Sequence, residues 1–297
     1  MLLLITGSGD GTADRIVLKL GEEVFRFNYD LFSDYKFQLT PDYWEIEDPV
    51  GRKISSLTCT RVFWWKAFSY WIEGQDKLIK AEVKYIFRDL FGLVTAQKIA
   101  KGNSPSWHDK VGKMHVLTLA KKYFEIPTTL VTSGLSGIDI FNSKKVVAKS
   151  LASQLSNQNT VLFTTDVETN RLHPDFPWYL QEKIQSRWDV TVFYCDGNVF
   201  PFKRDRINLK GIDWRAEQSL DVQVEEWLPF KLTQEQSKAF DLLSNDLDVE
   251  FGRYDLMTNG DSEELIFLEF NANGQWVFLD YQEKYGLLDA VVNWLRK

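Results

Sequence analysis

Histidine and cysteine are scarce in this chain of 297 residues, and their scarcity argues against several kinds of active site. The three histidines, His108, His115 and His173, include no pair with the spacing of zinc ligands. Cys59 and Cys195 lie far apart and have no histidine close by in sequence, so we expect reduced, structural thiols. The sequence also lacks a G-x-S-x-G elbow, and it therefore supports neither a zinc enzyme nor a nucleophilic hydrolase.

Long apolar runs and an excess of basic charge are missing as well. No stretch approaches the ~20 apolar residues that a membrane helix needs, and residues 1–6 become polar too soon for a signal peptide. The 35 basic and 42 acidic residues give a net charge of −7, whereas a general nucleic-acid binder carries a basic footprint. We therefore expect a cytoplasmic protein that binds neither nucleic acid nor membranes.

The chain does have ample core material and an alternation of strand and helix patterns. Apolar residues make up 44% and aromatic residues 14% of the sequence. Residues 2–6, 13–20 and 23–27 predict a β-α-β opening, a helix is expected over about 80–98, and this alternation is typical of α/β lobes. The segment G-N-S-P-S at 102–106 has the composition of a lobe boundary.

The glycine-rich turn at residues 7–11, G-S-G-D-G, lies between the first strand and the first helix. It has neither a Walker lysine nor the G-x-G-x-x-G spacing. Glycine is the default residue where the backbone bends sharply, so we favour a tight turn over a phosphate-binding loop.

A carboxylate and an amide fall on one face of a predicted strand near the C-terminus. Glu269 and Asn271 are two residues apart in the segment F-L-E-F-N-A-N-G-Q-W at 267–276 and face the same side, with Leu268 and Phe270 on the other. A turn at 259–261 predicts a hairpin that returns Asp255 to this face. Three oxygen ligands of this kind suit Mg²⁺. A solvated face of an amphipathic strand remains the alternative.

A lysine closes another apolar strand at 145–149, and Lys149 is either a solvated strand end or a cation in a binding crevice. Further along, T-Q-E-Q at 233–236 is a capping-box signature that predicts the start of a helix. The aromatic-rich residues 61–66 are best explained as buried packing.

Several segments carry a family resemblance, and they stand in one order along most of the chain. They are 10–14, 25–28, 113–120, 126–132 (I-P-T-T-L-V-T), 146–149 (V-V-A-K), 178–184, 189–194, 213–215 (D-W-R), 254–257 (Y-D-L-M) and 267–276. In this order they resemble the ATP-grasp ligases, and in particular the peptide maturases that make microviridin-type ω-ester and ω-amide crosslinks, the graspetide enzymes. Ala272 replaces the proline usual in the last segment.

The resemblance implies an α/β, ATP-grasp fold with an N-terminal Rossmann-like pre-ATP-grasp domain. The implied domains are 1–106 (N-terminal α/β), 107–184 (central ATP-grasp lobe) and 185–297 (C-terminal lobe with the Mg²⁺ site). The implied cofactors are ATP and Mg²⁺. The implied site residues are Lys113 and Lys149 on the nucleotide phosphates, the hinge residues Gln181, Glu182, Lys183 and Ile184 around adenine, Asp255, Glu269 and Asn271 on the metal, and Arg215 with Lys149 in catalysis.

The sequence also departs from the family. Thr191 stands where these ligases usually place an arginine that faces the phosphate, and Arg204, Arg206 or Arg215 are candidates to supply the missing charge. Arg215 is the better candidate for meeting an acidic side chain of the substrate, because a guanidinium binds a carboxylate with two parallel bonds. The loop at 150–165, expected over the phosphates, contains no glycine.

The implied function is ligation of acidic side chains of a ribosomally made precursor peptide, through an acyl phosphate, to its own Thr, Ser or Lys. The partner is that precursor, with a leader and an acidic core, and a homodimer is left open. From the aromatic density between residues 25 and 91 we expect the N-terminal half to recognise the leader. The alternatives are an amino-acid or small-peptide ligase like the ribosomal-protein glutamate ligase, and a non-catalytic peptide- or nucleotide-binding module.

Overall fold

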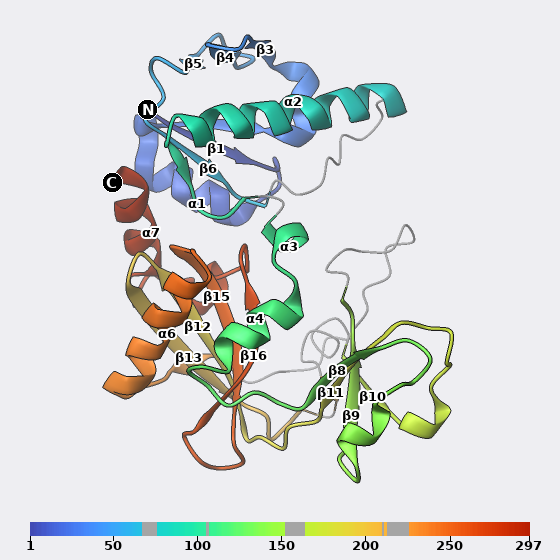
Figure 1. Ribbon diagram of the computed structural model, residues 1–297. Helices are drawn as coiled ribbons and strands as arrows, with labels where there is room; N and C mark the ends of the chain where they lie inside the picture. Colours follow the sequence, from blue (N-terminus) through green and yellow to red (C-terminus); the bar gives the residue numbers. More distant parts are fainter. Residues whose placement is uncertain (67–75, 105–106, 152–163, 210, 213–225) are drawn as a thin grey trace.

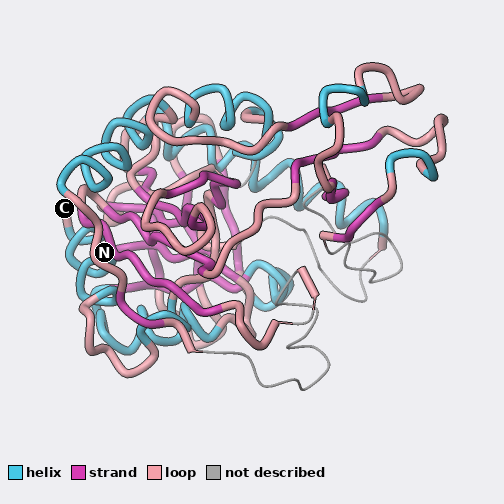
Figure 2. Tube along the Cα trace, turned by 90° about the horizontal axis from the view of Figure 1, so that it is seen from below, coloured by secondary structure: helices cyan, strands magenta, loops and turns pink. Residues whose placement is uncertain are grey.

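The computed structural model describes residues 1–66, 76–104, 107–151, 164–209, 211–212 and 226–297 (Figure 1). These residues form three main sheets and one small one. The sheet built from β8 to β11 stands to one side of the other two main sheets in both views (Figures 1 and 2). Within the described residues, no helix combines the length and the apolar character that crossing a membrane requires.

The N-terminal part is a parallel sheet with a helix on each face. Strands β1 (Leu2–Thr6), β2 (Val24–Asn28), β6 (Arg61–Trp64) and β7 (Ala100–Lys101) pair in the order β2-β1-β6-β7. Side chains alternate along β1, so Leu2 and Leu4 pack in the cluster that contains α1 (Gly11–Leu20), while Leu3 and Ile5 pack in the cluster that contains α2 (Lys77–Ala96). The predicted β-α-β opening is confirmed. The small antiparallel sheet of β3 (Lys36–Leu39), β4 (Trp44–Glu47) and β5 (Lys53–Ser55) follows β2 in the chain.

In the glycine-rich turn and at the start of α1, backbone amides donate to carboxylates of the protein itself. Asp10 caps α1 by accepting the Ala13 backbone N–H at 2.9 Å, and the same oxygen accepts the Trp65 indole N–H at 2.9 Å. The carboxylate of Asp30 accepts the backbone N–H of Ser8 at 2.8 Å. A carboxylate that occupies an amide of this turn would repel a phosphate, which fits the interpretation as a tight turn.

The aromatic residues of the N-terminal part are mostly core, which removes the observation behind the expected leader surface. Phe25, Phe27, Trp44, Trp64 and Phe87 are all buried in one cluster between the parallel sheet, α2 and the small sheet. The aromatic density of these residues therefore reflects the packing of the core. Residues 67–75, which continue the aromatic run, lie outside the described residues.

The central sheet is antiparallel, with the order β10-β9-β11-β8. Its strands are β8 (Thr129–Thr132), β9 (Val146–Lys149), β10 (Thr165–Val167) and β11 (Trp178–Glu182). The expected loop at 150–165 falls mostly on residues 152–163, outside the described part of the chain.

The C-terminal sheet has five antiparallel strands in the order β14-β13-β12-β15-β16. They are β12 (Trp188–Cys195), β13 (Asn198–Asp205), β14 (Leu228–Pro229), β15 (Phe251–Thr258) and β16 (Leu265–Asn271). One face packs against α4 (Lys113–Ala120) and α6 (Gln234–Asp246), and α7 (Leu287–Arg296) covers part of the other. The short helix α3 (Trp107–Lys110) precedes α4.

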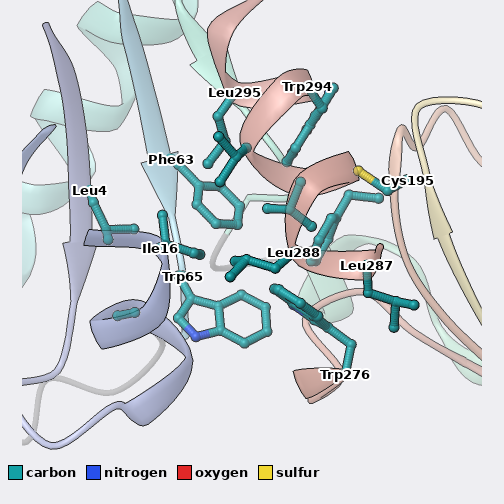
Figure 3. Packing of buried hydrophobic residues seen from close by; sticks show 14 of the residues in the cluster. Leu4, Ile16, Phe63, Trp65, Cys195, Trp276, Leu287, Leu288, Trp294 and Leu295 are labelled. Carbon is teal, nitrogen blue, oxygen red and sulfur yellow. The ribbon is translucent and has the colours of Figure 1, made fainter. Parts of the chain in front are cut away.

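One large cluster of buried residues joins the two ends of the chain. Figure 3 shows Phe63 and Trp65 of the N-terminal part facing Leu288 and Trp294 of α7, with Trp276 beside them. Helix α7 thus packs between the C-terminal sheet and α1. The domain boundaries at 106/107 and 184/185 stay a prediction.

Candidate active-site cleft

One face of the C-terminal sheet is covered at one end and open at the other. Along β12, Phe193 and Cys195 are buried under α7, while Asp189 and Thr191, on the same face by alternation, line a cleft. Strand β15 repeats this pattern, with Phe251 in the core and Arg253 and Asp255 in the cleft. The cleft encloses about 970 Å³ of empty space, including the part open to solvent.

The cleft contains most of the predicted site residues. The predicted residues among its lining are Lys149, Gln181, Glu182, Lys183, Ile184, Asp255 and Glu269. Lys113 and Asn271 line an adjoining smaller cavity that shares Glu269 and Leu268 with the cleft. Arg215 lies outside the described residues.

The hairpin of β15 and β16 places the predicted metal ligands together. In the antiparallel register Asp255 stands opposite Glu269, and Arg253 opposite Asn271. The Asp255 carboxylate accepts hydrogen bonds from the Asn271 side-chain amide and from the Thr191 hydroxyl, the latter at 3.0 Å. The juxtaposition predicted from the turn and the alternation is present in the structure.

The expectation that Leu268 faces the opposite side from Glu269 is wrong. The pairing shifts between Asp255 and Leu256, whose partners are Glu269 and Phe267, so Leu268 is the extra residue of a β-bulge. Leu268 therefore lines the cleft beside Glu269, whereas Phe270 is buried as expected.

The donor set fits Mg²⁺ only if other oxygens complete it. Asp255 and Glu269 offer two carboxylates, and among the described residues no group of three His, Cys, Asp or Glu side chains is arranged to hold a metal. Mg²⁺ usually keeps waters and substrate phosphate oxygens beside one or two carboxylates. The residues present therefore suit a metal that is shared with a phosphorylated substrate.

Lys149 reaches into the cleft from the central sheet. It stands opposite Tyr179 in the pairing of β9 with β11, and its Nζ lies 3.4 Å from the Gln181 side-chain oxygen. Gln181 is itself buried, and its amide nitrogen donates to the Thr129 hydroxyl at 3.1 Å. Lys149 thus lies half-buried on the cleft face of the sheet.

Lys113, at the start of α4, bridges the central and C-terminal sheets. Its Nζ donates to the Ser150 carbonyl at 2.8 Å and lies 3.6 Å from a Glu269 oxygen. It also lies 5.8 Å from the centre of the Tyr179 ring. Burial, and then the negative charge of Glu269, raise the pKa of the Tyr179 hydroxyl well above its usual range.

The hinge residues are fixed at the end of β11. The amides of Glu182 and Lys183 donate to the Thr128 and Lys145 carbonyls, each at 2.8 Å. Burial of the Glu182 carboxyl opposes ionisation, but hydrogen bonds from Lys144 and Thr128 together outweigh it and lower the pKa of Glu182. In the described part of the chain the Ile184 backbone amide has no backbone or side-chain partner, which leaves a donor at the cleft edge.

Two of the three arginines proposed to replace the charge at Thr191, Arg204 and Arg206, lie within the described residues, and their environments differ. Arg204 is 2% exposed, pairs with Asp189 and is absent from the cleft lining. Arg206 lines the cleft but pairs with the same carboxylate and donates to the Ile212 carbonyl at 3.2 Å. Arg253 also lines the cleft and was not predicted from the sequence, although it lies two residues from Asp255 and therefore on the same strand face.

Known structures resemble the chain over its whole length. A RiPP-associated ATP-grasp ligase from Chryseobacterium gregarium, in complex with ADP and a leader and core peptide, is 22% identical with a TM-score of 0.82, covering 99% of this chain and 96% of that one. The macrocyclase MdnC from Microcystis aeruginosa MRC, bound with precursor peptide MdnA, is 20% identical with a TM-score of 0.80, covering 100% and 99%. The ATP-grasp ligase PsnB, complexed with minimal precursor, Mg and ADP, is 17% identical with a TM-score of 0.69, covering 99% and 97%.

No protein-family model and no curated protein sequence matches this chain. At these identities the structural likeness establishes the fold. The chain has an ATP-grasp fold, and the fold class predicted from the sequence is confirmed.

Proposed function

We propose that this chain is an ATP-dependent carboxylate ligase that forms ω-ester or ω-amide crosslinks within a ribosomally made precursor peptide. One observation carries the proposal: a single cleft of an ATP-grasp fold joins Lys149 and the end of β11 from one sheet to Asp255 and Glu269 from another. Cations, carboxylates and a backbone amide that has no partner among the described residues suit, in one cleft, a nucleoside triphosphate with its metal. The solved relatives were captured with ADP, Mg and precursor peptides.

The proposed roles follow from position. Gln181, Glu182, Lys183 and Ile184 border the adenine, Lys149 and Lys113 meet the phosphates, and Asp255, Glu269 and Asn271 hold Mg²⁺, which would neutralise phosphate charge when bound. Arg215 stays proposed for the substrate carboxylate from sequence alone. The precursor peptide, with a leader and an acidic core, is the proposed partner.

The reaction would proceed in two steps. A carboxylate oxygen of the peptide attacks the γ-phosphorus of ATP, ADP leaves, and an acyl phosphate forms. A hydroxyl or amine of the same peptide then attacks the acyl carbon, phosphate leaves, and the attacking group loses its proton. Since phosphate leaves readily, the enzyme needs no covalent nucleophile, and its contribution is positioning and fixed charge.

Mass spectrometry tests the proposal directly. The enzyme is incubated with Mg-ATP and the peptide of a short reading frame beside its gene that repeats Thr and Glu or Asp positions. We expect the loss of one water for each crosslink and one ADP for each water lost, and neither without Mg²⁺. A peptide that gains mass by added amino acids would favour the small-substrate ligase, and nucleotide binding without any ADP release would favour a non-catalytic module.

A further inference from the structure

Arg253 is a cleft cation whose hydrogen-bonding capacity is only partly used. Its side chain is 13% exposed, its Nη2 lies 3.1 Å from an Asp255 oxygen, and its Nη1 donates to the Gln275 carbonyl at 2.8 Å. A guanidinium carries five N–H donors. Among the described residues its Nε, although buried, has no hydrogen-bond partner. Buried donors are normally paired, so an unpaired one inside a cleft indicates a missing acceptor.

The strand around Arg253 is closely packed, and the hydrogen bonds to Asp255 and Gln275 hold the guanidinium. A Cβ at the preceding Gly252 would come within 2.3 Å of the Phe270 ring, so only glycine fits there. A Cβ at Gly274 would lie 3.0 Å from the Arg253 Cβ, and the guanidinium carbon lies 5.7 Å from the centre of the Phe278 ring. A positioned guanidinium loses little freedom when it binds an anion.

Two other cations of the cleft have carboxylate partners. Arg206 pairs with Asp189, and Lys183 donates to Asp166 at 2.7 Å. Arg253 also has a carboxylate partner, but Asp255 accepts from Thr191 and Asn271 as well. Asp255 is moreover a carboxylate that we place on Mg²⁺. The carboxylate that compensates the charge of Arg253 is therefore shared with other groups.

Arg253 also lies where the N-terminal part meets the cleft. The residue whose carbonyl it binds, Gln275, accepts a hydrogen bond from the Thr12 hydroxyl at 2.7 Å with its side chain. Burial lowers the pKa of Lys66 to about 8; the carboxylate of Asp10 opposes this shift, and the charge of Arg253 adds to it. The positive charges of Arg253 and Lys66 thus repel each other.

We propose that Arg253 binds the side-chain carboxylate of the peptide that is to be activated and remains bound to the acyl phosphate formed from it. The proposal rests on the proposed function. The guanidinium fork meets a carboxylate with two parallel bonds and can follow the same oxygens once one of them carries the phosphoryl group. The strand position next to Asp255 keeps this anion beside the proposed metal site. The end of the cleft near Arg253 is therefore the peptide end, and the Ile184 edge is the nucleotide end.

Calorimetry with two probes separates this role from nucleotide binding. Mg-ADP is titrated first, and acetyl phosphate, the smallest acyl phosphate, is titrated into the Mg-ADP-loaded protein. We compare wild type with Arg253→Met, Arg253→Lys and the control Arg187→Met. The Arg187 side chain is 51% exposed, pairs with Asp205 and is absent from the cleft lining, so the control removes the same charge outside the cleft. We expect Arg253→Met to bind acetyl phosphate about 10- to 100-fold more weakly, the value of a charge-assisted hydrogen bond. Arg253→Lys should fall in between, and Arg187→Met should match wild type.

The outcomes discriminate among the roles. Acetyl phosphate affinity that is equal in wild type and Arg253→Met, or absent from wild type, overturns the assignment. Loss of both probes in Arg253→Met also overturns it, because Arg253 would then only hold Asp255 in place. If Arg253→Met does not fold, as judged by its melting temperature, Arg253→Lys against wild type decides. A wild type that binds no Mg-ADP contradicts the proposed function instead, and acetyl phosphate titrated into nucleotide-free protein still tests Arg253.

Discussion

At the scale of single residues, strand alternation predicted the cleft well where the strands are regular and poorly where they are not. Asp255 and Glu269 follow from period-two spacing and a turn, and the register confirms their meeting. Leu268 was misplaced because a bulge depends on the cross-strand partner, which is unknown until the hairpin forms. By the same alternation Arg253 lies on the strand face of Asp255, but an arginine near a proposed metal ligand belongs to no motif that predicts a site.

Glu269 offers the sharpest test of the metal assignment. Glu269→Gln keeps the volume but removes one acceptor charge, so the Mg²⁺ concentration for half-maximal ADP formation should rise about tenfold or more, since even outer partners contribute that much to metal affinity. The control is Glu264→Gln, which removes an exposed charge at the turn of the same hairpin. An unchanged Mg²⁺ dependence in Glu269→Gln would remove this residue from the site.

Lys149 tests the phosphate assignment. Lys149→Met keeps the aliphatic stem and deletes the charge, so the ATP affinity measured by calorimetry should fall about tenfold, as expected for one charge-assisted contact. Lys145→Met serves as the control, because Lys145 is exposed just before the same strand. If both variants bind ATP as tightly as wild type, Lys149 does not contact the phosphates and its Nζ only donates to Gln181.

At the scale of elements, local signals predicted helices and strands better than they predicted their neighbours. The helix expected over about 80–98 is α2, with its two ends displaced by two or three residues. The packing of α4 on the C-terminal sheet follows from tertiary contacts that no local pattern encodes. The described aromatic residues whose density suggested a peptide surface are mostly core, because composition does not show which side chains a fold buries.

The capping box of α6 can be tested by itself. The Thr233 hydroxyl accepts the Gln236 backbone N–H at 3.1 Å, and the Gln236 side-chain oxygen accepts the Thr233 backbone N–H at 2.9 Å. Thr233→Ala removes the first bond and should lower the free energy of unfolding by about 1 kcal/mol, whereas Thr233→Ser should change it little. Urea denaturation measures both, and equal losses in the two variants would show that the methyl group matters rather than the cap.

At the scale of the whole molecule, the order of the lobes was predictable and the joint between the chain ends was not. Each main sheet draws its strands from one continuous stretch, so sequence order places them. The cluster that contains Leu4, Phe63, Leu288 and Trp294 instead joins residues more than two hundred positions apart. Such contacts depend on shape complementarity that one sequence alone does not reveal.

This shared core should make the N-terminal and C-terminal sheets unfold together. Leu288 is 5% exposed and packs within the cluster that joins the two sheets (Figure 3). Leu288→Ala removes buried methyl groups and leaves a cavity, so we expect the free energy of unfolding to fall by about 2–5 kcal/mol. The control Leu18→Ala, at an 85% exposed position on α1, should change it by less than about 0.5 kcal/mol. Tryptophan fluorescence and far-ultraviolet circular dichroism should report one coincident transition in both variants. Two separated transitions in Leu288→Ala, with the wild type still showing one, would mean that the cluster couples sheets that are each stable alone; two in the wild type would contradict the shared core.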